Sequence, residues 1–128
     1  MIDHVSIAVR DLASAESFYS ALLTPLGMTK LREWPNAAIG FGKKYPEFWI
    51  NQRSAMGPIA EDSGAHICLR APDSGAVDAF HEAALQAGGT SDGGPGLRPE
   101  YHGAYYAAFV RDPDGNRVEA VTFLRDGA

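Results

Sequence analysis

Two histidines stand at matching places in a repeated stretch of this sequence. His4 opens the run HVSIAVRDLASAESFY, and His66 opens the similar run HICLRAPDSGAVDAFH. The same offset along the chain pairs Asp11 with Asp73. A neutral imidazole is a common metal ligand, and it can also transfer protons near neutral pH. Because a repeated unit implies a pseudo-symmetric fold, we expect both histidines to contribute to one shared site on the symmetry axis.

A second group of candidate residues gathers in a glycine- and proline-rich segment, SDGGPGLRPEYHG (91–103), and just after it. Arg98 could clamp an anionic group of a substrate, and Tyr101 is a further candidate for substrate contact. His102 or Tyr105 could transfer protons. Shaped surface loops are the usual home of binding residues. The alternative is a loop that packs on its own aromatic side chains and leaves Arg98 in solvent.

The elements that must position these residues follow from the alternation of apolar and polar side chains. Residues 2–10 alternate with the period of two that is typical of a strand, with the apolar residues on one face and His4 on the other. Residues 65–71 repeat this arrangement around His66. Because the apolar face should pack against a helix, both histidines are expected on the opposite, concave face.

The predicted order of elements is βαβββ, repeated, which defines an α+β domain. Asp11 caps a first helix that ends at Pro25 and Gly27, and Asp73 caps a second helix. DPDGN (112–116) has the chemistry of a hairpin turn. The expected strands lie at about 2–10, 28–34, 37–42, 48–51, 65–71, 104–111 and 117–123, with 91–103 as a loop. We predict one domain, 1–128, made of module one (about 1–52), a linker (about 53–64) and module two (about 65–125).

Composition excludes several classes of protein. A net charge of −5 with scattered basic residues argues against nucleic-acid binding. No apolar stretch is long enough to span a bilayer, and the first residues do not resemble a signal peptide. The single cysteine, Cys68, excludes an intrachain disulfide, and we expect it to be a buried, inert thiol. These features predict a cytoplasmic protein that binds neither nucleic acid nor membrane.

Three stretches of the chain resemble the vicinal oxygen chelate superfamily, which includes glyoxalase I, fosfomycin-resistance thiol transferases, extradiol dioxygenases and bleomycin-binding proteins. They are IDHVSIAVRDL with the Phe-Tyr pair that follows, GAHICLRAPD, and DPDGNRVEAV, of which the last is the most specific. The resemblance covers essentially the whole chain. It implies paired βαβββ modules that form a curved, cup-shaped mixed sheet with helices on the outside, and commonly a divalent metal within the cup.

The resemblance also implies metal-ligand positions on the first and last strands of each module. Carried over residue by residue, His4, His66 and Glu119 match three of these positions. The fourth falls at Trp49 or Ile50, and neither side chain can bind a metal. Two histidines and one carboxylate suit Fe, Mn, Ni, Co or Zn and leave coordination positions open. This set is less similar to glyoxalase I, with its four protein ligands, than to the transferases and dioxygenases.

Two kinds of function follow from the resemblance. The first is a metal-dependent enzyme that holds a small substrate through neighbouring oxygens, for lyase or isomerase chemistry, ring-cleaving dioxygenation or thiol addition. In such an enzyme His102 and Tyr105 are similar in kind to the histidine and tyrosine that precede the carboxylate strand of extradiol dioxygenases. The second is a metal-free protein that binds a drug or metabolite, as bleomycin-resistance relatives do.

Relatives with paired modules in one chain commonly form homodimers, often with modules paired across subunits. A homodimer is therefore implied, and whether His4 meets His66 within one chain or across two stays open. Trp34, Phe48 and Trp49 are expected to line the cup or to belong to the core. Trp49 is the candidate among them for contact with a substrate, since an aromatic side chain can shape an apolar pocket.

Overall fold

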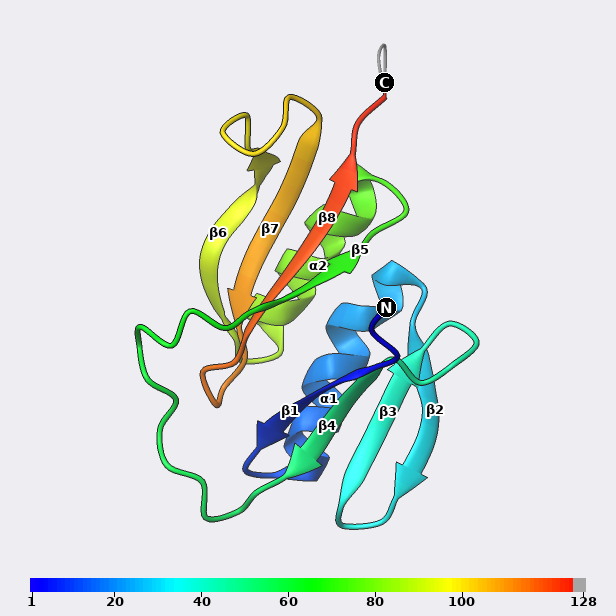
Figure 1. The fold of residues 1–128 in the computed structure, drawn as a ribbon, viewed down its shortest axis with the longest axis vertical. Helices are drawn as coiled ribbons and strands as arrows, with labels where there is room; N and C mark the ends of the chain where they lie inside the picture. Colours follow the sequence, from blue (N-terminus) through cyan, green and yellow to red (C-terminus); the bar gives the residue numbers. More distant parts are fainter. Residues whose placement is uncertain (126–128) are drawn as a thin grey trace.

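The structure is a computed structural model that describes residues 1–125, so the last three residues of the predicted domain 1–128 lie outside the described residues. Figure 1 shows the path of the chain. Module one contains β1 (Val5–Val9), α1 (Leu12–Leu23), the 3-10 helix η1 (Thr24–Leu26), β2 (Thr29–Trp34), β3 (Ala38–Gly42) and β4 (Phe48–Gln52). Module two contains β5 (Ile67–Arg70), α2 (Ser74–Gln86), β6 (Thr90–Leu97), β7 (Tyr105–Arg111) and β8 (Arg117–Phe123).

Each module builds its own four-stranded mixed sheet, in the orders β1-β4-β3-β2 and β5-β8-β7-β6. The first strand of each module runs parallel to the last one, and the other pairs are antiparallel. Helices α1 and α2 pack against each other behind the sheets (Figure 1). The predicted α+β fold with repeated βαβββ modules and outer helices is confirmed. We call the helix-free side of each sheet its open face.

The apolar core lies between the helices and the sheets and explains which side chains turn inward. Val9 is fully buried and Ile7 packs against the core, whereas Ser6, which directly precedes Ile7, is exposed. Both predicted helix caps are present, since the Asp11 and Asp73 side chains accept hydrogen bonds from backbone N–H groups in the first turn of α1 and α2. No helix within residues 1–125 is long and apolar enough to cross a membrane.

Strand β6 occupies the first part of the segment that was expected to be a loop, so that prediction was wrong for 91–97. Its register against β7 shifts between Ser91 and Gly93 and again between Gly93 and Gly96. Gly93 has a φ of +156°, and a Cβ atom there would lie 3.0 Å from a ring carbon of Phe109, so both the backbone conformation and the space favour glycine. A glycine-rich, irregular strand lacks the apolar alternation from which strands are predicted.

The turn at 112–116 joins β7 to β8, which confirms the predicted hairpin, and it also fastens module two to module one. Asp112 is buried and accepts a hydrogen bond of 2.6 Å from the Tyr19 hydroxyl of α1. The Asn116 amide donates to the Ala8 carbonyl at 2.8 Å. The Arg10 guanidinium lies 2.9 Å from a carboxylate oxygen of Asp114. The turn therefore sets how the modules sit relative to each other.

Candidate functional site

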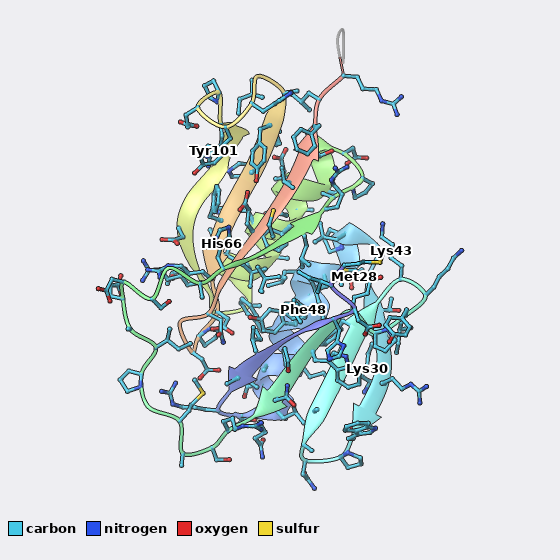
Figure 2. The ribbon with its side chains drawn as sticks, in the orientation of Figure 1. Met28, Lys30, Lys43, Phe48, His66 and Tyr101 are labelled. Carbon is cyan, nitrogen blue, oxygen red and sulfur yellow. The ribbon has the colours of Figure 1, made fainter. Side chains whose placement is uncertain are left out.

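A buried carboxylate lies at the centre of the open face of module two. Glu119 on β8 is only 2% exposed, although its side chain can carry a charge. Its Oε1 lies 3.1 Å from Nε2 of His66, and its Oε2 accepts a 2.5 Å hydrogen bond from the Tyr105 hydroxyl on β7. Figure 2 shows His66 where the chain enters β5. Two partners thus hold one acid in place.

The register of the strands explains this grouping. The parallel pairing of β5 with β8 places Cys68 opposite Glu119, and the antiparallel pairing of β7 with β8 places Phe109 opposite the same residue. The Cys68 sulfur lies 3.8 Å from the Tyr105 hydroxyl. The prediction of a buried cysteine was wrong, because the parity that turns His66 to the open face turns Cys68 there too, where it is exposed.

Desolvation governs the protonation of both groups beside Glu119. It raises the pKa of the Cys68 thiol to about 11, with a further contribution from the negative charge of Glu119. Desolvation, followed by the hydrogen bond to Glu119, raises the pKa of Tyr105 well above its ordinary value. At neutral pH the thiol is therefore protonated and weakly nucleophilic, and Tyr105 is a hydrogen-bond donor rather than a base.

The loop between β6 and β7 packs on its own aromatic side chains. The Tyr101 ring meets the Tyr105 ring edge-to-face with centroids 5.2 Å apart, and Figure 2 shows Tyr101 far along the sheet from His66. The His102 ring stacks in the same manner against Phe123 at 5.6 Å, and its Nδ1 accepts a hydrogen bond from the Ala104 N–H. Tyr105 is therefore the member of this group that contacts Glu119 directly.

Arg98 is half-buried beside the site rather than extended into solvent. Its guanidinium lies 5.3 Å from the centre of the Phe109 ring and donates a 2.6 Å hydrogen bond to the Gly94 carbonyl. Such a cation over an aromatic face is a stable arrangement. Because Phe109 stands opposite Glu119, the Arg98 charge is on the same face of the sheet as the carboxylate.

A pair of arginines on this face was not predicted. Arg111 and Arg117 stand opposite each other across β7 and β8, and both make ion pairs with Asp92 and with Glu61 of the linker. Arg117 and His66 line one pocket of about 210 Å³. Their place in the sequence could have indicated this pair, because the two arginines flank the predicted hairpin turn.

The open face of module one shows which residue replaces the fourth ligand. Ser6 on β1 pairs with Trp49 on β4, as Cys68 on β5 pairs with Glu119 on β8. Trp49 therefore occupies the position that corresponds to the acid. Ile50, the other candidate, is fully buried in the core.

His4 precedes β1 and lines a pocket on this face of module one. Its Nδ1 lies 2.7 Å from a carboxylate oxygen of Asp3, which also accepts a 2.9 Å hydrogen bond from the Tyr45 hydroxyl. These hydrogen bonds, that of His4 first, lower the pKa of Asp3. Because a carboxylate only accepts, Nδ1 is the donor in this contact, which leaves Nε2 as the ring nitrogen that can serve as a ligand. Such a carboxylate–histidine contact is typical of metal-binding histidines.

The three candidate ligands are not brought together within one chain. His66 and Glu119 form a pair in module two, whereas His4 lines the pocket of module one. Among the residues that the structure describes, no group of three or more His, Cys, Asp or Glu side chains is arranged to hold a metal ion. Within one copy of the chain, His4 and the His66–Glu119 pair therefore lie in two separate places.

Paired βαβββ modules with polar side chains on their open faces define an α+β protein of the glyoxalase fold. The family model for the Glyoxalase/Bleomycin resistance protein/Dioxygenase superfamily matches residues 1–120, and the chain belongs to this superfamily.

Individual relatives agree with this assignment. A probable lactoylglutathione lyase of Synechocystis sp. is 31% identical, over 92% of this chain and 92% of the relative. A glyoxalase/bleomycin resistance protein from Albidiferax ferrireducens T118 is 32% identical, covers 92% of this chain and 95% of its own, and superposes with a TM-score of 0.79. The fosfomycin resistance protein FosX from Listeria monocytogenes shares the fold at 15% identity, with a TM-score of 0.67, over 96% of this chain and 93% of its own.

Proposed function

We propose that the protein is a divalent-metal-dependent enzyme of the glyoxalase/dioxygenase type that acts on a small oxygenated substrate. The metal is held by His66 and Glu119 of one copy and by His4 of a second copy in a homodimer. The observation that carries the proposal is the His66–Glu119 pair, a buried carboxylate 3.1 Å from an imidazole nitrogen. Imidazole nitrogens and a carboxylate oxygen are suitable ligands for Fe, Mn, Ni, Co and Zn.

The need for a second copy follows from the separation of the ligands. A two-fold dimer that sets module one of each copy against module two of the other makes equivalent contacts on both sides. It would supply the free Nε2 of His4 to the His66–Glu119 pair. The ion pairs of Arg111 and Arg117 with Glu61 attach the linker to module two. They therefore support a fixed placement of His4 relative to the His66–Glu119 pair.

The residues of the chain itself would bind and orient the substrate. When bound, the metal would polarise two neighbouring substrate oxygens as a Lewis acid. Tyr105 keeps its proton and orients Glu119, while Arg98 offers a positive charge for an anionic substrate group. The similarity to a probable lactoylglutathione lyase of Synechocystis sp. supports lyase chemistry.

The proposal is tested by metal titration of protein purified without a chelator. We expect one divalent ion per chain in the wild type, and at least ~10-fold weaker binding in His66→Ala, because even residues that only orient a ligand contribute 10–100-fold to affinity. His81→Ala on α2 is the matched control and should bind as the wild type does. Equally weak binding by wild type and His66→Ala would contradict the enzyme and favour a metal-free binding protein.

A further inference from the structure

The open faces of the two modules differ at one position. Module one has an aromatic ring there, whereas module two has the carboxylate of Glu119. Trp49 and Glu119 hold corresponding positions in the strand register. The replacement removes a charge and adds a large flat surface to the proposed cup. Such a ring can either fill space within the protein or offer its face to a ligand.

The ring of Trp49 is held in one orientation by its neighbours. A Cβ atom at Gly40 would lie 2.9 Å from two carbons of the indole, so the ring lies directly against the glycine backbone of β3. Pro46 packs at the same place, and its carbonyl accepts a hydrogen bond of 3.2 Å from the indole Nε1. A ring fixed in this way loses little conformational entropy when a ligand binds to it.

A second tryptophan completes the surface. Trp34 at the end of β2 is 62% exposed, and its ring centre lies 5.6 Å from that of Trp49 at an interplanar angle of 45°. Both rings line a pocket of about 280 Å³ together with His4, Tyr45 and Asn51. None of the described residues that line this pocket is Asp, Glu, Lys or Arg. The Asp3 carboxylate contacts two of the lining residues, His4 and Tyr45. The strongly exposed indole beside a fixed one nevertheless favours an aromatic ring at this place.

We propose that Trp34 and Trp49 form a stacking site for a planar, uncharged aromatic ring of the substrate. The inference deepens the proposed function and rests on it in one respect: His4 lines the same pocket, so a ring bound there places its substituents beside a proposed metal ligand. The substrate class is then a compound that carries a planar aromatic ring. Asn51, whose amide donates to the Ser6 hydroxyl, is a further polar residue in the lining.

The chain offers a direct readout, because both of its tryptophans lie in this pocket. The intact protein is titrated in EDTA with 2-naphthalenemethanol and, separately, with its saturated counterpart decahydro-2-naphthalenemethanol, while the indole N–H signals are followed by NMR. We expect both signals to shift saturably with the aromatic probe. The saturated probe should bind at least ~5-fold more weakly, since stacking adds to the effect of apolar area alone.

Two variants complete the experiment. Trp34→Leu, at an exposed position, should weaken binding of the aromatic probe at least ~5-fold, as followed on the remaining Trp49 signal. Leu85→Ala, an exposed apolar position on α2, should leave it unchanged. Absence of a saturable shift, equal affinity for both probes, or unchanged affinity in Trp34→Leu would each overturn the inference. EDTA removes metal from this test, so its failure is distinct from a failure of the His66→Ala metal titration.

Discussion

Glu119→Gln is expected to reduce the affinity for divalent metal by at least ~100-fold. Glu119 would be the single anionic ligand of the proposed site, and its replacement by a neutral amide of the same shape removes the charge that balances the cation. Partners that only orient a ligand already contribute 10–100-fold, so loss of a ligand should cost no less. The side chain is held by His66 and Tyr105 in the absence of metal, and the amide can keep one of these hydrogen bonds.

Isothermal titration with Zn²⁺ and Mn²⁺ measures this effect. Glu82→Gln, an exposed acid on α2, makes the same chemical change away from the site and should leave binding intact. Thermal unfolding of both metal-free variants shows whether the fold survives. Binding by folded Glu119→Gln within threefold of the wild type would remove Glu119 from the ligand set.

Asp112→Ala is expected to lower the free energy of unfolding by about 3–5 kcal/mol, since each buried group left without a partner costs about 1–3 kcal/mol. Asp112 is 5% exposed and accepts hydrogen bonds from the Tyr19 hydroxyl, from the Asn116 side chain, and from the backbone N–H groups of Asp114 and Asn116. Its loss would leave the buried Tyr19 hydroxyl without this acceptor and loosen the turn that fastens the modules together.

Urea unfolding measures the change in free energy. Asp62→Ala, an exposed acid of the linker, is the control and should change stability by less than about 0.5 kcal/mol. If the loss of stability in Asp112→Ala arises from the lost hydrogen bond of Tyr19, then Tyr19→Phe should destabilise the wild type. The same substitution should have little further effect in the Asp112→Ala background. Additive effects of the two substitutions would show that the hydrogen bond between them contributes little.

The fold could be predicted where local patterns and tertiary structure agree. Alternation around Val5, Ile7 and Val9 identified the buried side of β1, and Asp11 and Asp73 cap the helices as expected. The pattern failed at β6, where bulges and glycines replace alternation. It also did not decide whether Trp49 or Ile50 holds the fourth ligand position, because that depends on the parallel pairing of β1 with β4. This pairing is a long-range contact that has no local sequence pattern.

The candidate site could be predicted only in part. The repeat and the family resemblance identified His4, His66 and Glu119, but not that Tyr105 donates to Glu119 or that Asp3 accepts from His4. The contact of Tyr105 with Glu119 depends on how β7 and β8 pair, and that of His4 with the neighbouring Asp3 depends on the conformation of both side chains. The separation of His4 from the other two ligands depends on how the modules pack, and so has no signature in the repeat.

The central claim, a metal site shared between two copies of the chain, is tested most directly by mixing His4→Ala and His66→Ala proteins. Each variant alone lacks a ligand in every site. In a mixed dimer, a shared site would combine the intact His4 of one copy with the intact His66 and Glu119 of the other. We predict that subunit exchange between the two variants restores one metal ion per mixed dimer, whereas no recovery in a confirmed mixed dimer would contradict a shared site.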